Sequence, residues 1–269
     1  MPSKNIGVVT DTGRRRERNE DSCLVDADMG LFVVSDGMGG HKGGEVASTM
    51  AVRTIGEAVR NGRSLRQAIV AAHRAIRNAG DRDPEIRGMG ATAVVLQLQG
   101  NEYEIAWVGD SRAYLWDGAL RRLTHDHSYI QQLIDAGAFT PAEAKHHPGG
   151  GIVTRALGMQ DIPQIDVDTV SGRLSDGSRL FLCSDGLTSE LDDEEIADLL
   201  REDGTEQEMA ERLVKTANER GGRDNITVVL VRPHSPSLFG KLKRNPITAA
   251  VGTILVAAMA AVTFWLLNR

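Results

Sequence analysis

The chain has 269 residues, of which 41% are hydrophobic, so it can bury a substantial core in one large domain or two small ones. Its formal net charge is −6 and its pI is near 5.7. This acidic balance argues against a nucleic-acid partner, because phosphate-backbone binding needs a basic face. Both cysteines, Cys23 and Cys183, lie in apolar stretches and are expected to be core thiols of a reducing compartment, not a disulfide.

Short β-rich runs separated by Gly-containing turns occupy much of the chain. The run 23–36 is interrupted at 28–30 by Asp, Met and Gly, which predicts a β-hairpin. Other strands are expected at 5–11, 91–99, 102–110, 112–118, 119–124, 179–186 and 225–232. Because the runs between 91 and 124 follow one another without a helix, they predict antiparallel pairing.

Helical patterns lie between these groups of strands. Residues 45–60 place small apolar side chains on one face, and capping boxes at 64–67 and 205–208 open two more amphipathic helices. A shorter helix is expected at 193–200. Since strands and helices are segregated and do not alternate, the sequence predicts an α+β fold in which helices cover antiparallel sheets.

The C-terminal part has a different composition. Residues 5–232 show no repeat or low-complexity stretch and are expected to form one domain, whereas 233–246 contain three prolines and a basic cluster, typical of an extended linker. Residues 247–267 are 21 uncharged, mostly apolar positions. A helix of that length, at about 1.5 Å per residue, crosses a hydrocarbon core of about 30 Å.

We therefore expect one transmembrane helix at 247–267. The alternative, an apolar helix docked on the domain, would show an apolar stripe and not uniform apolarity. Basic residues lie just before the segment, at 241, 243 and 244, and only Arg269 lies after it. By the positive-inside rule, the large N-terminal part is expected to be cytoplasmic.

The same tripeptide, Ser-Asp-Gly, ends two apolar runs and places Asp36 and Asp185 at strand ends. Burying an unpaired carboxylate is costly, so such residues usually meet a cation, donors or water. Other acidic residues at strand ends or in Gly-flanked turns are Glu20, Asp21, Asp110 and Asp224. A set of oxygen donors favours Mg²⁺ or Mn²⁺ over zinc, and paired ions of this kind activate water toward phosphate esters.

The glycine-rich stretch 37–45 is not a nucleotide P-loop. It lacks the GxxxxGK[ST] order, and its spacing does not match GxGxxG. Its glycines instead suit a close approach of the backbone to a metal and the turn into the helix at 45.

An ordered series of motifs identifies the family that the chain resembles. They are TDTGRRRERNED, VVSDGMGGHKGGEVAS, GMGAT, VGDSRAYL, LTHDHS, TRALG, LFLCSDGL and DNITVVLV. In this order they resemble the metal-dependent type 2C serine/threonine protein phosphatases (the PPM family) in their bacterial form. The resemblance extends from about Asn5 to Arg232.

The resemblance implies a four-layer α-β-β-α sandwich: two central, mainly antiparallel sheets flanked by helices, with metals at one end. It implies that Asp36 bridges two Mn²⁺ or Mg²⁺ ions, with the carbonyl of Gly37 on one of them. Asp185 and Asp224 would hold the first ion and Glu20 and Asp21 the second; Asp110 with Asp185 would match the ligands of a third ion in bacterial members. Arg16, four residues before Glu20, takes the position of the phosphate-gripping arginine.

The implied reaction is direct attack of a metal-bridging hydroxide on phosphoserine or phosphothreonine, without a covalent intermediate. Eukaryotic members carry a general-acid His directly after the first Asp-Gly, where this chain has Met38, so the proton donor is unassigned; His41 and a metal-bound water are candidates. The glycines of HHPGGG predict a looser substrate-side segment between Thr124 and Thr154. The histidines of this segment are expected to be solvated and are assigned no metal: His125, His127, His146 and His147.

The leading hypothesis is a phosphatase tethered to the inner face of a bacterial membrane, acting on the phosphorylated protein substrates of a serine/threonine kinase. A second hypothesis is a catalytically inactive, membrane-anchored phosphoprotein-binding module, which would predict loss of Asp36, Asp185 or Asp224; all three are present. A third keeps the enzyme but changes its substrate, for example to a small phosphate ester.

Overall fold

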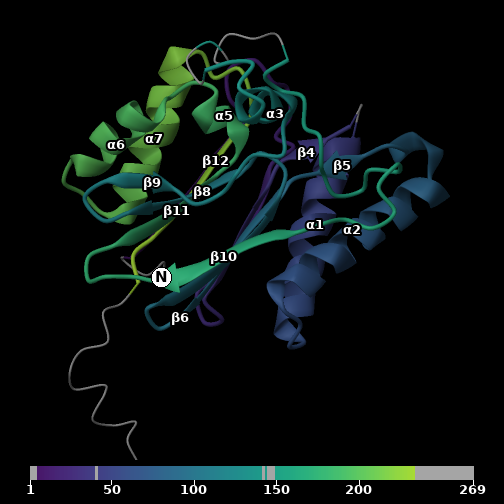
Figure 1. The fold of residues 1–269 in the computed structure, drawn as a ribbon, viewed down its shortest axis with the longest axis horizontal. Helices are drawn as coiled ribbons and strands as arrows, with labels where there is room; N and C mark the ends of the chain where they lie inside the picture. Colours follow the sequence, from purple (N-terminus) through teal and green to yellow (C-terminus); the bar gives the residue numbers. More distant parts are fainter. Residues whose placement is uncertain (1–4, 40–41, 141–142, 144–148, 234–269) are drawn as a thin grey trace, which may run out of the picture. The chain divides into compact units, whose positions relative to one another are not determined.

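The computed structural model describes residues 5–39, 42–140, 143 and 149–233. The described residues belong to one compact unit, Met1–Pro233, drawn as the coloured ribbon in Figure 1.

Two five-stranded antiparallel sheets form the centre of this unit. The first sheet has the order β1 (Ile6–Asp11), β12 (Ile226–Val231), β11 (Arg179–Cys183), β8 (Arg112–Trp116) and β9 (Leu120–Arg122). The second has the order β10 (Asp168–Arg173), β7 (Glu102–Val108), β6 (Ala93–Gln99), β3 (Leu31–Ser35) and β2 (Ser22–Asp26). A small ribbon pairs β4 (Gly37–Met38) with β5 (Gly90–Ala91).

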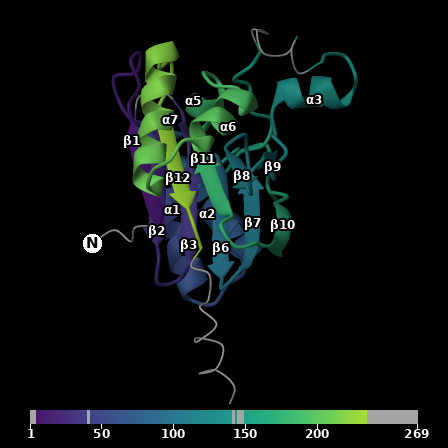
Figure 2. The ribbon, with the colours of Figure 1, turned by 90° about the vertical axis from the view of Figure 1, so that its left-hand side faces the viewer.

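Helices cover the outer face of each sheet, α6 and α7 on one side and α1 and α2 on the other (Figures 1 and 2). Their bounds are α1 (Gly43–Arg60), α2 (Leu65–Arg82), α6 (Asp193–Arg201) and α7 (Glu206–Arg220). Capping boxes at Ser64 and Thr205 begin α2 and α7, as predicted. Short elements in the described residues are η1 (Pro84–Ile86), α3 (Tyr129–Asp135) and α5 (Asp185–Thr188).

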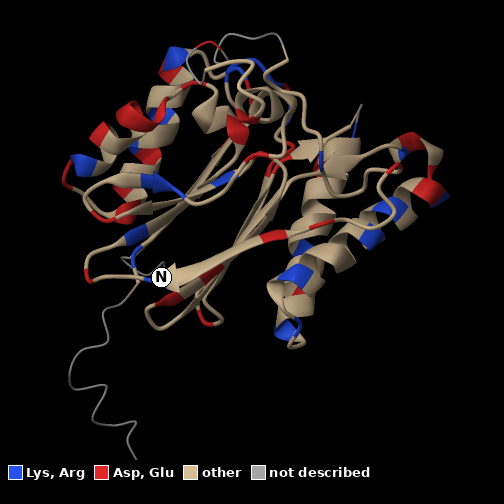
Figure 3. Cartoon of the chain, in the orientation of Figure 1, with Lys and Arg blue, Asp and Glu red and all other residues tan. Residues whose placement is uncertain are grey.

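Three apolar layers follow from this arrangement. One lies between α1, α2 and the second sheet, around Ile55 and Ile69; one lies between α6, α7 and the first sheet, around Leu213. The third fills the space between the two sheets, around Phe32 and Leu182. Charged residues are frequent along the helices, whereas the strands between them are mostly uncharged (Figure 3). The α+β class and the four-layer α-β-β-α sandwich are thus confirmed.

Several elements were not predicted. β10 was missed because its polar sequence, DTVSGR, lacks the apolar run used to find strands, although its alternating burial is that of a half-covered edge strand. α3 and α5 are too short to show a helical period. Cys183 is buried as expected, whereas Cys23 is only half-buried; both are free thiols.

Membrane spanning was predicted for residues 247–267, which lie outside the described residues. Within the described part of the chain, no helix combines the length and the apolar character that a bilayer crossing requires. The predicted linker 233–246 also lies outside it, except for Pro233.

Candidate metal centre

The two Ser-Asp-Gly strand ends meet at one end of the sandwich. Asp36 follows β3 of the second sheet, and Asp185 follows β11 of the first sheet and begins α5. Their carboxyls lie close enough for each to shift the pKa of the other: Asp185 raises the pKa of Asp36. Two residues 149 positions apart in the sequence, one from each sheet, therefore build one site.

Asp21 lies beside this pair and is held by two hydroxyls. Ser184 and Thr227 each donate to its Oδ2 at 2.7 Å. Its Oδ1 is buried without a hydrogen-bond partner, as is Oδ1 of Asp185. Buried oxygens of this kind are costly unless something else satisfies them, and a cation would do so.

The electrostatics show how closely the carboxyls are gathered. Burial, reinforced by the neighbouring Asp185 and Asp224, raises the pKa of Asp21 to about 7 despite its two hydroxyl donors. Burial and then the charges of Asp21 and Asp185 raise the pKa of Asp36 well above its usual range. The pKa of Asp110 is raised well above its usual range by burial and then by Asp185. Such mutual repulsion is what a divalent cation relieves.

Glycines bring Glu20 against the start of α1. A Cβ on Gly44 would lie 2.7–2.9 Å from the Glu20 carboxylate, and one on Gly37 would lie 2.1 Å from the Gly44 carbonyl oxygen. Only glycine fits at both positions, because Gly37 lies against backbone and Gly44 against the Glu20 carboxylate. The expected turn from the strand into the helix is confirmed, since α1 begins at Gly43. Burial raises the pKa of Glu20 as well.

Arg16 reaches the same cluster. Its Nη2 donates to Oδ2 of Asp224 at 2.7 Å, and its side chain is half exposed. Asn225 organises this side of the site: it accepts the N–H of Glu20 at 2.8 Å and donates to the carbonyls of Thr12 and Arg18. The structure thus brings together the predicted residues Arg16, Glu20, Asp21, Asp36, Gly37, Asp110, Asp185 and Asp224.

The side chains do not enclose an ion as they stand. Within the described residues, no three His, Cys, Asp or Glu side chains converge on a point where they would hold a metal. Asp36 is turned toward Asp185, and Asp224 toward Arg16. The donor chemistry nevertheless fits Mg²⁺ or Mn²⁺, because the set consists of carboxylates and a backbone carbonyl and leaves two buried carboxylate oxygens unpaired.

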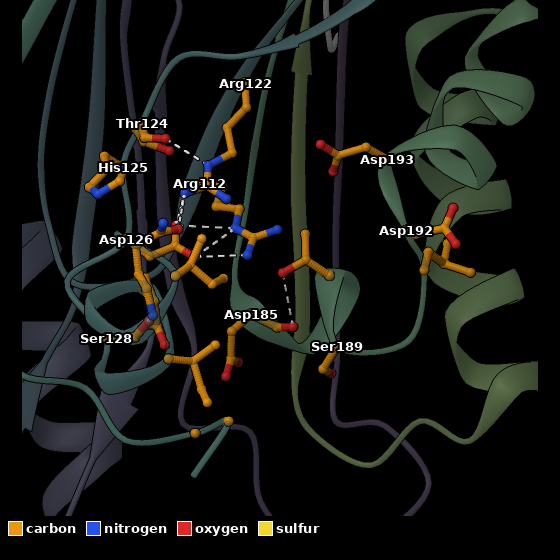
Figure 4. Close-up of a pocket in the computed structure, with 18 of the residues that line it drawn as sticks. Arg112, Arg122, Thr124, His125, Asp126, Ser128, Asp185, Ser189, Asp192 and Asp193 are labelled. Atoms are coloured by element: carbon orange, nitrogen blue, oxygen red, sulfur yellow. Dashed lines mark hydrogen bonds and ion pairs between the residues drawn. The ribbon is translucent and has the colours of Figure 1, made fainter. Parts of the chain in front are cut away.

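A cleft of about 810 Å³ opens beside the cluster, with Asp110, Asp185 and Asp224 in its lining. Figure 4 shows Asp185 in this cleft. Arg112 lies in its wall and donates to both oxygens of Asp126, the closest contact being 2.7 Å. Sequence reasoning missed this pair, although an arginine two residues after Asp110 in GDSR is a signal. It also missed Ser184 and Thr227; the serine of each Ser-Asp-Gly was the clue to the first.

The histidines of the segment 124–154 differ from expectation. His125 is exposed and pairs with Asp135 at 2.8 Å, as a solvated residue can. His127 is buried, so the expectation that it is solvated was wrong. His41, His146 and His147 lie outside the described residues.

Comparisons with known proteins agree with this geometry. Residues 11–230 match the family Protein phosphatase 2C. The serine/threonine phosphatase stp of Listeria monocytogenes is 37% identical over 236 residues, which cover 82% of this chain and 93% of that protein.

Solved structures agree as well. That of the Mycobacterium tuberculosis serine/threonine phosphatase PstP/Ppp has a TM-score of 0.78 at 34% identity and covers 85% of this chain and 98% of its own. A structure of the PstP catalytic domain in complex with two manganese ions has a TM-score of 0.75 at 33% identity, covering 84% and 96%. The chain therefore belongs to the protein phosphatase 2C family and is a serine/threonine protein phosphatase.

Proposed function

We propose that this phosphatase hydrolyses phosphoserine and phosphothreonine in proteins by a reaction that requires Mn²⁺ or Mg²⁺. The observation that carries the proposal is the gathering of buried carboxyls from both sheets, with raised pKa values and two unpaired oxygens, beside a cleft. Manganese is favoured because it is bound by the PstP catalytic domain, a relative of the same fold. Magnesium is retained because it prefers the same oxygen donors.

Each carboxylate has an assigned task. Asp36 would be shared by two ions, the Gly37 carbonyl would bind one of them, and Asp185 and Asp224 would hold the first. Glu20 and Asp21 would serve the second ion, and Asp110 with Asp185 would match a third. When bound, these ions supply a water-derived nucleophile and neutralise charge on the phosphoryl group.

Side chains of the protein itself orient the carboxylates and bind the phosphate. Ser184 and Thr227 fix one oxygen of Asp21, which leaves its other oxygen available. Arg16 is half exposed and its guanidinium donates to Asp224, a position from which it can turn toward a phosphate. A planar guanidinium fork matches two phosphate oxygens at once.

The deciding experiment uses the full chain purified in a mild detergent. Hydrolysis of a phosphothreonine peptide is measured with Mn²⁺, with Mg²⁺ and with a chelator, alongside Asp185→Ala. Activity that requires metal and is lost in the variant supports the proposal. Lack of activity with every metal contradicts it and would favour a binding module. A preference for phosphotyrosine peptides would contradict the substrate assignment.

We further propose that residues 5–232 act as a cytoplasmic catalytic domain, joined by the linker 233–246 to a single transmembrane helix at 247–267 in the inner membrane of a bacterium. The support is the uncharged stretch and the basic residues before it. Fluorescent fusions of the full chain and of a variant lacking 247–267 test this. The full chain should be on the membrane and the variant in the soluble fraction; a variant that stays on the membrane contradicts the tether.

A further inference from the structure

Two distant parts of the chain are joined into a short stem beside the acidic cluster, residues 127–129 and 152–154. Two backbone hydrogen bonds and one β-bridge form it: Thr154 N–H to the His127 carbonyl at 2.8 Å, Tyr129 N–H to the Ile152 carbonyl at 2.8 Å, and the Ser128–Val153 bridge. The stem lies within the connection between β9 and β10, which contains α3. By pairing 127–129 with 152–154, it fixes the point at which this connection departs from the sandwich.

His127 fastens the stem to the end of β7. Its backbone N–H donates to the Gly109 carbonyl at 3.0 Å, and its Nδ1 accepts the Gly109 N–H at 3.0 Å. Its Nε2 lies 2.8 Å from Oδ2 of Asp168 on β10. Because Nδ1 accepts, the ring proton lies on Nε2 and is donated to Asp168; burial lowers the pKa of His127, which favours this neutral form.

Gly109 has little freedom of its own. Its φ is +106°, and a Cβ there would lie 2.6 Å from the Thr92 side chain. Its peptide is thus held between Thr92 on one side and His127 on the other. The next residue is Asp110, so a shift of Gly109 moves that carboxylate directly.

Thr92 extends the connection to the centre of the site. Its Oγ1 accepts the N–H of Asp36 at 2.9 Å and lies 2.7 Å from Oγ of Ser111. The turn Gly109–Ser111 and the end of β3 are therefore fixed against each other through one buried threonine. His127 is the outer support of this assembly.

We propose that His127 is a positioning residue: its Nδ1–Gly109 hydrogen bond sets the place of Asp110 relative to Asp36 and ties that place to the stem. This inference rests on the proposed metal-dependent function. A positioning role differs from a role in packing alone, in which the imidazole would only fill space beside Trp107. The centroids of these two stacked rings are 6.4 Å apart.

Two variants test the two ring nitrogens of His127 separately. Asn places its amide oxygen where Nδ1 lies, so His127→Asn keeps an acceptor for Gly109 but loses the Asp168 contact. Gln reaches the Nε2 position, so His127→Gln keeps a donor to Asp168 but loses the acceptor for the Gly109 N–H, while the backbone bond from residue 127 to the Gly109 carbonyl remains. Asp168→Asn is the matched control, since it leaves the Gly109 contact of His127 intact while changing the Asp168 contact and the ion pair of Asp168 with Arg155 at 3.5 Å.

The full chain is used for three measurements: Mn²⁺ binding by titration calorimetry, kcat and KM with p-nitrophenyl phosphate, and amide hydrogen exchange at Gly109 and Asp110. We expect His127→Gln to weaken Mn²⁺ binding by about 10- to 100-fold and to lower kcat with little change in KM. Exchange at both amides should accelerate. His127→Asn and Asp168→Asn should bind Mn²⁺ within about threefold of wild type.

Equal Mn²⁺ affinities for the Gln and Asn variants, or a loss in Asp168→Asn as large as in His127→Gln, would overturn the inference. If wild type binds no Mn²⁺, the proposed function fails instead. Hydrogen exchange then still tests His127, because unchanged exchange at Gly109 in His127→Gln overturns its role without any metal. Should His127→Asn not fold, the comparison of His127→Gln with Asp168→Asn decides.

Discussion

The two halves of the sandwich end a core strand in the same tripeptide, yet the chain continues from it differently. After β3, Asp36 leads into the two-residue strand β4, whereas after β11, Asp185 begins the helical turn α5. The carboxyls of Asp36 and Asp185 nevertheless lie next to each other in the acidic cluster. Ser-Asp-Gly therefore delivers a carboxylate at a strand end, while the residues after it, Met-Gly in one case and Leu-Thr in the other, decide the path of the backbone.

The two serines also differ in what they support. Ser35 donates to the Thr92 carbonyl at 2.7 Å and thereby holds backbone in the second sheet. Ser184 donates to the Asp21 carboxylate and accepts the N–H of Thr227 at 2.9 Å. The first half thus fixes its strand end through backbone contacts, and the second half also orients an acidic side chain of the site.

The largest expected effect is the loss of either central carboxylate. Asp36→Asn and Asp185→Asn should each lower activity by about a thousandfold or more, equivalent to about 4 kcal/mol of transition-state stabilisation. In a chelator, at a pH high enough to ionise these carboxyls, both variants should melt at a higher temperature than wild type, because less buried negative charge remains. Peptide hydrolysis and calorimetry measure the two effects.

Asp161→Asn, an exposed site, is the control for those variants. If one central variant kept substantial activity, the two halves would not contribute equally to the site.

The glycines of the two tripeptides should respond alike. A Cβ on Gly37 would lie 2.1 Å from the Gly44 carbonyl oxygen, and one on Gly186 2.0 Å from the Asn225 carbonyl oxygen. Gly37→Ala and Gly186→Ala should each lower the free energy of unfolding by about 1–3 kcal/mol or more, because the backbone must move to make room for the methyl group. The melting temperature should fall by about 2–4 °C for each kcal/mol lost.

Gly151→Ala serves as control, because no atom lies within 4 Å of its added Cβ. Destabilisation of only one of the two variants would show that the close approach matters in one half alone.

Substitutions of Ser184 and Ser35 should have different effects on the metal requirement. Ser184→Ala removes a donor from Asp21 and should raise the Mn²⁺ concentration for half-maximal activity by about 10- to 100-fold, as is typical for groups that orient a ligand. Ser35→Ala should lower stability by about 1 kcal/mol and change that concentration little. Metal titrations of activity, with thermal unfolding alongside, measure both. Equal metal requirements in the two variants would remove the distinction drawn between the serines.

The sequence predicted the frame and the acidic residues better than the contacts between them. Apolar runs and capping boxes located most of the strands and the main helices, because burial and end-capping act locally. The convergence of Asp36 with Asp185 was inferred only from a repeated tripeptide and the family resemblance. The role of Thr227 and the burial of His127 depend on packing between segments far apart in the chain, which a local pattern does not contain.

The smallest expected effect concerns His73, a buried histidine on α2. The helices that cover the other sheet, α6 and α7, contain no histidine. His73 on α2 accepts the Gly158 N–H at Nδ1, 3.1 Å away, and donates from Nε2 to the Ile162 carbonyl at 2.9 Å. Burial lowers its pKa below the ordinary value of 6.5. The unfolded chain therefore binds more protons than the folded chain once pH falls below about 6.5, so the stability that His73 contributes is present above that pH and is lost as pH falls.

His73→Asn keeps an acceptor for Gly158 but does not titrate, so it should melt below wild type at pH 7.5 and the gap should narrow toward pH 5. Thermal unfolding in a chelator at several pH values measures this gap, and the chelator removes pH effects that arise from metal binding. Because every other titrating group is common to the two proteins, their contributions cancel in the difference between the melting temperatures. A gap that stays constant would show that His73 does not titrate differently on folding, and the helical layers of the two halves would then not differ in this respect.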